Sequence, residues 1–339
     1  MYKFFLSKVI LMFLIMFVVS SITFFIIRWL PGDPVHLWVG DHPTKEQLSE
    51  ARKKLGLNEP IHKQYLSFLK KTAVLDLGIS LRTKQPVLVE LKNRFSATFE
   101  LVSFSMFFAF LLGFPLGVLS ALNVGTIYDY IVRGAVYLGL SLPVFWLAMV
   151  LQLVFFGFLQ WLPLQGRYMG LNTLEPQLTY NSGFLLVDSF FSGDWVLFYD
   201  ALKHIALPSI TMSIGVLGIV VRTTRSAIGD VMRNPFFITY ASYGFKNHEI
   251  IRYSAYKNAL VPVSTVAGLS FGLMLGGTFL VESIFDWPGL GHFSVLSILT
   301  SDFPAVIGVT LLYAFTYVII NFLIDIFYAF IDPRIDSQS

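Results

Sequence analysis

Long apolar stretches separated by polar segments set the pattern of this chain. The first apolar run extends unbroken from Val9 to Ile27, which is long enough to cross a bilayer as a helix. A cleaved signal peptide has a shorter apolar core and a small-residue cleavage site, so we expect residues 1–28 to form a retained first transmembrane helix. The other apolar stretches predict spans at about 99–122, 134–161, 204–222, 259–281 and 304–330. The pattern therefore predicts an all-α polytopic membrane protein with six transmembrane helices.

The polar segment at residues 29–97 separates the first two predicted spans. Thr44 and Gln47 have the spacing of a capping box that starts a helix, and Pro60 starts another after Asn58 and Glu59. We therefore expect a small ordered domain here. Segments longer than about 60 residues cross the membrane largely regardless of charge, so its excess of Lys and Arg does not hold this domain inside. We place it outside the cytoplasm, together with insertions at 162–203 and 281–304.

A basic segment at residues 222–262 separates the fourth and fifth predicted spans. Its acidic residues are Asp230 and Glu249, whereas its basic residues are Arg222, Arg225, Arg233, Lys246, Arg252 and Lys257. A short basic loop between two spans faces the cytoplasm by the positive-inside rule. With six spans, both termini then lie on the cytoplasmic side, and the tail at 332–339 is cytoplasmic. The segment is much longer than a turn between two helices requires, so we expect it to bind another molecule.

Composition narrows the possible functions. The chain is 55% hydrophobic and 13% charged, which is about half the charged share of soluble domains. The absence of cysteine excludes disulfides, thiolate metal sites and cysteine nucleophiles, and the net charge of +3 gives no argument for nucleic acid. There is no Gly-Lys pair, and therefore no phosphate-binding loop of the Walker type. If transport is active, ATP must be hydrolysed on another polypeptide, and this chain is not itself an enzyme.

Two alternative functions lack the residues that they would need. A self-contained carrier driven by protons or sodium would use a carboxylate in the middle of a span, and the predicted spans have none there. Gly268-Leu269-Ser270-Phe271-Gly272 matches the nucleophile elbow of hydrolases, but it lies within an apolar span with no histidine. The six histidines form no close pair or HExxH motif, so no metal site is expected. Both alternatives are disfavoured.

Small residues recur every four positions along the fifth predicted span. They are Ser264, Gly268, Gly272 and Gly276, and Gly113 with Gly117 has the same spacing in the second span. Such stripes let a neighbouring helix approach closely. Packing within the chain, a subunit interface and the lining of a pathway all fit this pattern. Gln152 is a further candidate for lining a water-filled pathway.

The basic segment predicts a helix that ends or bends at Gly244. Its aromatic residues, which we expect to be exposed, are Phe236, Phe237, Tyr240, Tyr243 and Phe245. An amphipathic helix of this kind fits a groove on a partner protein. A helix bound to the lipid surface through its basic face is the alternative.

Several blocks in this chain, in order and spacing, resemble a known family. They include Pro31-Gly32-Asp33-Pro34, Asp76-Leu77-Gly78-Ile79-Ser80, Ala97-Thr98-Phe99-Glu100-Leu101, Gly193-Asp194-Trp195, Arg222-x-Thr224-Arg225-Ser226, Lys257-Asn258-Ala259-Leu260-Val261-Pro262, Glu282-x-x-Phe285-x-x-Pro288-Gly289-Leu290-Gly291 and Asp332-Pro333-Arg334. The chain resembles, over nearly its whole length, the B-type permease subunits of oligopeptide, dipeptide and nickel ABC importers. The resemblance implies the type I importer permease fold, with five helices in residues 98–331 and a coupling loop at 222–258.

In that family the coupling loop contacts the ATPase through an EAA-like motif followed by a glycine. Here the glycine is Gly244, and the preceding residues are Thr239-Tyr240-Ala241-Ser242-Tyr243 instead of a Glu-Ala-Ala or Thr-Ala-Arg-Ala-Lys version. The resemblance therefore implies coupling contacts by Thr239, Tyr240, Ala241, Ser242, Gly244, Phe245 and Arg252. The loss of the basic residues suggests a divergent partner ATPase.

The resemblance also implies an assembly and a cargo. The partners would be a second homologous permease, two ATP-binding subunits that hold ATP and Mg²⁺, and an extracytoplasmic substrate-binding lipoprotein. The chain would form half of the translocation pathway in the bacterial inner membrane and bind no cofactor itself. Di- and oligopeptides are the expected cargo, with nickel or a metal chelate as the alternative.

Overall fold

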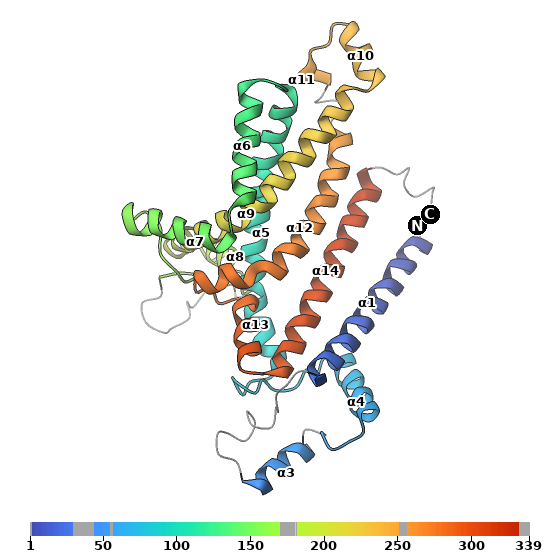
Figure 1. Ribbon diagram of the computed structural model, residues 1–339, viewed down its shortest axis with the longest axis vertical. Coiled ribbons are helices and arrows are strands. Elements are labelled where there is room, and N and C mark those ends of the chain that lie inside the picture. Colours follow the sequence, from blue (N-terminus) through green and yellow to red (C-terminus); the bar gives the residue numbers. More distant parts are fainter. Residues whose placement is uncertain are drawn as a thin grey trace. The chain divides into compact units, whose positions relative to one another are not determined.

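The computed structural model describes residues 2–29, 44–54, 57–169, 180, 182–250 and 256–331, and they are largely helical (Figure 1). The expected tail at 332–339 and the Pro31–Pro34 block lie outside these residues. The helices are α1 (Tyr2–Trp29), α3 (Lys45–Lys54), α4 (Ile61–Ala73), α5 (Val87–Leu122), α6 (Ile127–Ser141), α7 (Val144–Gln152), the π-helix η1 (Leu153–Phe158), α8 (Leu185–Ser192), α9 (Trp195–Met232), α10 (Pro235–Ser242), α11 (Asn247–Ile250), α12 (Tyr256–Ile284), α13 (Leu290–Leu299) and α14 (Phe303–Ile331).

Within the described residues, five helices are long and apolar enough to cross a membrane. A sixth span is obtained only if α6 and α7–η1 count as one, and these bend by 102° at their junction. The prediction of one continuous span at 134–161 is therefore wrong. The cause is local: a proline disfavours the helical conformation of the residue before it, and Leu142 before Pro143 is extended, with φ −81° and ψ 131°.

The chain divides into two compact units, and the division falls inside α5 and again inside α14. Unit 1 comprises residues 1–97 and 288–318, and unit 2 comprises residues 98–287 and 319–339. In unit 1, α1 packs against α4: the Ser21 and Tyr65 hydroxyls are 2.6 Å apart, and the Phe24 ring lies 5.2 Å from that of Phe68. The expected capping box is confirmed, since the Thr44 amide donates to Gln47 Oε1 and the Gln47 amide to Thr44 Oγ1.

A buried carboxylate organises the rest of unit 1. Asp302, just before α14, accepts hydrogen bonds from the Ser80 hydroxyl and from the amides of Leu81 and Arg82. The adjoining apolar core consists of Val87, Leu91, Leu290, Phe293, Ala305 and Val309. Residues about 220 positions apart along the chain are thereby held together. The segment at 77–97 is thus ordered by contacts with residues 290–309, which the sequence patterns do not indicate.

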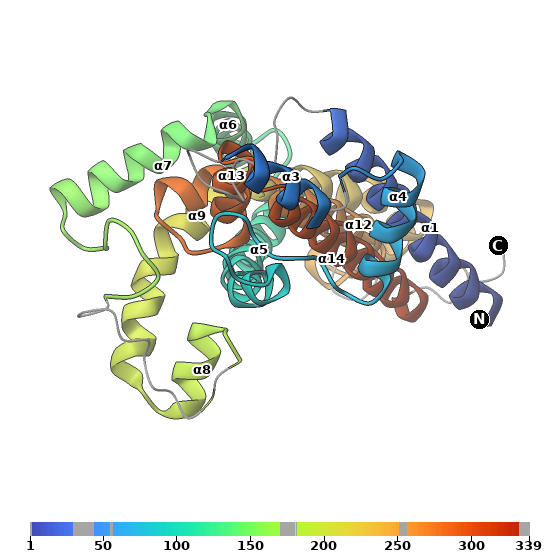
Figure 2. The same ribbon diagram turned by 90° about the horizontal axis from the view of Figure 1, so that it is seen from below.

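Unit 2 contains α6, α7, α8, α9, α10, α11 and α12 with most of α5, and α9 packs against α6, α7, α8 and α12 (Figure 2). The α5 helix approaches α9 closely at two glycines. A Cβ on Gly113 would lie 3.0 Å from Val220 Cγ1, and a Cβ on Gly117 would lie 2.6 Å from Thr224 Cβ. These two glycines therefore serve helix packing within the chain, one of the roles expected for small residues.

We expect Gly117→Ala to destabilise the protein although alanine favours helices. The added methyl overlaps Thr224 and the carbonyl oxygen of Val221, and overpacking of this kind costs about 1–3 kcal/mol. Gly229→Ala is the matched control, because it is also in a helix and its Cβ would have no atom within 4 Å. Thermal unfolding in detergent should show a lower midpoint for Gly117→Ala and an unchanged or higher one for Gly229→Ala. Equal midpoints would contradict the close approach of α5 and α9.

Candidate functional site

The candidate site begins where α9 ends and the chain turns into the short helix α10. Arg233 caps the end of α9, Asn234 is extended, and Pro235 occupies the first position of α10. Proline suits this position because its missing N–H would have no helical partner there. The Thr239 hydroxyl donates to the Pro235 carbonyl oxygen, and the Ser242 hydroxyl donates to that of Thr239. These hydroxyls are therefore occupied by the backbone of α10 itself.

Gly244 terminates α10, as the sequence suggested. Its φ of +88° is in the left-handed region that favours glycine. The Gly244 amide donates to Ala241 O (3.0 Å), and the Phe245 amide donates to Tyr240 O (3.3 Å). The rings of Tyr240 and Phe245 meet edge to face, with centroids 5.7 Å apart. This is a Schellman motif with its accompanying hydrophobic contact.

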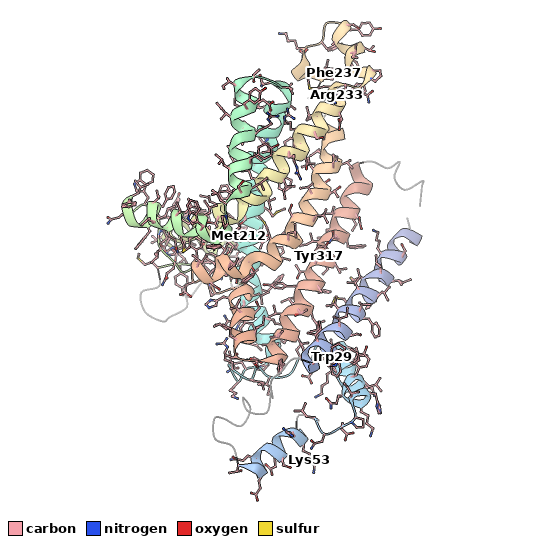
Figure 3. All side chains as sticks on the ribbon, in the orientation of Figure 1. Trp29, Lys53, Met212, Arg233, Phe237 and Tyr317 are labelled. Atoms are coloured by element: carbon pink, nitrogen blue, oxygen red, sulfur yellow. The ribbon has the colours of Figure 1, made fainter. Side chains whose placement is uncertain are left out.

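One side of α10 is packed against other helices, and the other side is exposed. Phe237 is only 6% exposed and packs into an apolar cluster with Val118, Ala121, Ile228, Val231 and Ile250. Figure 3 shows Phe237 on α10 next to Arg233, at the end of α9. The expectation that Phe237 is exposed was therefore wrong, because it is the residue that attaches α10 to α5 and α9. The outer surface instead presents Ile238, 64% exposed, and Tyr243, 77% exposed, with Tyr240 and Phe245.

The short helix α11 completes the segment. Glu249 accepts a hydrogen bond from the Lys246 amide, as in one half of a capping box, and Ile250 is buried in the same cluster as Phe237. In Figure 1, α10 and α11 lie at the end of unit 2 where α5 turns into α6. Among the predicted coupling residues, Thr239, Tyr240, Ala241, Ser242, Gly244 and Phe245 lie in or directly after α10. Arg252 lies outside the described residues.

The small-residue stripe lies on α12, but its members differ in surroundings. Gly268 is buried, and a Cβ there would lie 2.4 Å from Ile324 Cδ1 on α14. Gly276 is exposed with no atom near its Cβ position, Gly272 is half-buried, and the Ser264 hydroxyl donates to Leu260 O. Gly268 is therefore a packing residue, whereas Gly276 is not in close contact with the described part of the chain. The Gly268–Gly272 motif around Ser270 is helical, which does not provide the strand–turn–helix of a hydrolase elbow.

Gln152, a candidate for lining a pathway, makes two hydrogen bonds within the chain. Its side-chain amide donates to the carbonyl oxygens of Leu164 (2.9 Å) and Ile284 (3.2 Å). The bond to Ile284 satisfies a carbonyl at the end of α12 that has no helical partner. Gln152 thus ties the segment after η1 to the end of α12.

Two buried ion pairs in unit 2 were missed by sequence reasoning. Asp129 pairs with Arg225, with Oδ1 2.9 Å from Nε. Glu100 pairs with Arg167, with Oε2 2.5 Å from Nη2. The only sequence signal was that Glu100 and Asp129 flank the uncharged stretch at 101–128, and nothing in the pattern indicated their partners. Within the described residues, no group of three His, Cys, Asp or Glu side chains could hold a metal ion.

Together these features define a multi-pass, all-helical membrane protein with an exposed apolar segment beyond the end of a long span. Comparison with known families identifies the class further. Residues 113–337 match the model of the binding-protein-dependent transport system inner membrane component, and residues 1–102 match the model of the N-terminal part of such components. The chain belongs to this family. It is therefore an inner membrane component of a transport system that works with a binding protein and an ATP-binding subunit.

Individual relatives match over almost the full length. The probable D,D-dipeptide transport system permease protein DdpB of Escherichia coli is 39% identical over 94% of this chain and 92% of its own length. The di/tripeptide transport system permease protein DppB of Pseudomonas aeruginosa is 37% identical over 95% of each chain. The glutathione transport system permease protein GsiC of Pectobacterium atrosepticum is 31% identical over 99% of each. The expected family is thereby confirmed.

Proposed function

We propose that this chain forms half of the translocation pathway of an ATP-driven importer for di- and oligopeptides. The observation that carries the proposal is the full-length similarity to permeases named for D,D-dipeptides, dipeptides and di/tripeptides. These names favour peptides over nickel as the cargo. A second homologous permease forms the other half of the pathway, and an extracytoplasmic lipoprotein delivers the peptide.

ATP and Mg²⁺ bind on separate ATPase subunits, so this chain carries no catalytic residue. The ATPase contacts the coupling surface, which we define as Ile238, Thr239, Tyr240, Ala241, Ser242, Tyr243, Gly244 and Phe245. Its exposed apolar side chains support this role, because an apolar patch on a short helix suits a groove on a partner protein. ATP-driven closure of the ATPases would draw the coupling surfaces of the two permeases together and open the pathway outward.

The test is reconstitution of the complete transporter in proteoliposomes. We expect uptake of a labelled dipeptide that requires ATP, the binding protein and an ATPase able to hydrolyse ATP. Uptake of Ni²⁺ but not of peptide would identify the alternative cargo. Peptide uptake by this chain alone, without ATP, would show that it is a secondary carrier and not part of an ATP-driven importer.

The proposed orientation places the coupling surface and both termini in the cytoplasm and residues 29–97 outside. Because the chain has no cysteine, single-cysteine variants test this directly. Lys246→Cys should react with a membrane-impermeant maleimide only after the inner face is opened. Val74→Cys, at a site 75% exposed in unit 1, should react from the outside of intact cells. The reverse labelling pattern would overturn the orientation.

A further inference from the structure

Asp129 lies in the first turn of α6, and its side chain is only 2% exposed. Its carboxylate accepts hydrogen bonds from the Ser120 hydroxyl (2.5 Å) and the Gly125 amide (3.3 Å). It also accepts two from the Arg225 guanidinium, from Nε to Oδ1 (2.9 Å) and from Nη2 to Oδ2 (3.1 Å). Arg133, one turn further along α6, is more distant, with its Nε 3.9 Å from Oδ2. One carboxylate thus receives four hydrogen bonds, two of them from a single guanidinium.

These donors come from different elements of unit 2. Ser120 is in the last turn of α5, Gly125 is in the turn before α6, and Arg225 is in α9. A two-pronged arginine–carboxylate pair fixes direction as well as distance, because both N–H bonds must align with both oxygens. The Asp129 carboxylate therefore fixes the relative positions of α5, α6 and α9 at one point.

The position of this pair relative to the coupling surface gives it a role. Arg225 lies about two turns before the end of α9 at Met232, and α10 begins at Pro235. The anchor residue Phe237 holds α10 to Val118 on α5 and Ile228 on α9. That apolar cluster contains no residue of α6. The Asp129–Arg225 pair is therefore a polar connection between α6 and α9, the helix that leads into the coupling surface.

A buried ion pair is a poor source of stability, since removing both charges from water costs about as much as their attraction returns. Its geometric specificity is the better-attested benefit. Apolar contacts of Val132 and Val136 with Val221 already join α6 to α9. Apolar attraction of this kind is non-directional, whereas a two-pronged pair fixes a direction.

We propose that Asp129 and Arg225 are positioning residues for transport: their ion pair keeps α5, α6 and α9 moving as one piece. Displacement of α10 by the ATPase then also moves α6 and its bent continuation, α7. This inference rests on the proposed function, in which the coupling surface receives the movement of the ATPase. The pair stays closed throughout the transport cycle and acts as a rigid link.

The first test measures the ATP hydrolysed per peptide imported by the complete transporter in proteoliposomes. Asp129→Asn and Arg225→Gln should each raise this ratio by roughly 2- to 30-fold, the range typical of mutations that weaken coupling between sites. Arg225→Lys keeps the charge but loses the two-pronged geometry, so its ratio of ATP to peptide should lie between the ratios of these variants and of wild type. The double variant Asp129→Asn/Arg225→Gln should hydrolyse no more ATP per imported peptide than either single variant. Arg133→Gln is the matched control and should leave the ratio unchanged.

The second test needs no change to the pair itself. Spin labels on Ile127→Cys in α6 and Ser226→Cys in α9, both exposed positions, report the distance between these helices. We expect the same distance distribution in the nucleotide-free and vanadate-trapped transporter. A distribution that shifts between the two states would overturn the rigid link. The rigid link would also be overturned if the Asp129→Asn transporter assembled and hydrolysed as much ATP per imported peptide as wild type. If the wild-type transporter showed no ATP-dependent peptide uptake, the proposed function itself would be overturned.

Discussion

Gly244→Trp will leave the transporter assembled but abolish ATP hydrolysis linked to peptide transport. A Cβ on Gly244 would have no atom within 4 Å, so an indole there projects away from the chain. It would stand beside Tyr243 and Phe245 on the coupling surface and fill the space that the ATPase needs. The anchor residues Phe237 and Ile250 lie in the buried cluster and are not displaced. Assembly is measured by co-purification of the two permeases, and coupling by peptide-stimulated ATP hydrolysis.

The backbone of Gly244 requires a control for strain. At φ +88°, any side chain with a Cβ costs of order 1–3 kcal/mol, independent of its size. Asparagine tolerates the left-handed region better than other residues and is much smaller than tryptophan. Gly244→Asn should therefore retain most of the coupled ATP hydrolysis. The coupled hydrolysis of Gly244→Ala should lie between that of Gly244→Asn and that of Gly244→Trp. Normal coupled transport by Gly244→Trp would show that α10 does not contact the ATPase.

Local structural features were predicted correctly from the sequence where the interacting residues are close together along the chain. The capping box of Thr44 and Gln47 and the helix end at Gly244 depend on residues within six positions of each other. The apolar lengths likewise indicated the spans, because one helix satisfies its own backbone hydrogen bonds in lipid. The break between α6 and α7 was missed although Leu142-Pro143 carries its signal, since the stretch at 134–161 is uniformly apolar.

Contacts between distant residues were not predictable from these patterns. In α10 the run Phe236-Phe237-Ile238 is apolar throughout, and only the packing of Phe237 against α5 and α9 decides which side chain is buried. Arg225 and Asp129 are 96 positions apart, and Arg167 and Glu100 are 67 apart. A single chain gives no signal that relates such positions. The polar connections of unit 2 are therefore visible only in the structure.

Glu100→Gln will loosen the segment at 164–169 and the start of α8 without unfolding the rest of unit 2. The Glu100 carboxylate, near the start of unit 2 in α5, accepts from Arg167 Nη2 (2.5 Å) and from the Leu186 amide (2.8 Å). Arg167 also donates to Gly183 O (2.8 Å) and lies 5.9 Å from the centre of the Trp287 ring. Glutamine keeps an acceptor for the Leu186 amide but removes the negative charge. The guanidinium, only 14% exposed, then lacks its counter-charge.

The expected cost follows from the burial of this pair. Removing one partner of a buried ion pair costs about 3–5 kcal/mol, and the residual exposure of Arg167 places this case near 3 kcal/mol. Hydrogen exchange of the α8 amides should then be faster by roughly 100-fold, since 1.4 kcal/mol corresponds to a factor of ten. Glu59→Gln makes the same chemical change in an exposed pair with Lys63, whose side chains are 57% and 64% exposed. Exposed pairs of this spacing contribute about 0.3–0.5 kcal/mol, so exchange near Glu59 should change by no more than about threefold. Equal responses at the two sites would mean that the Glu100–Arg167 pair does not hold this segment to α5.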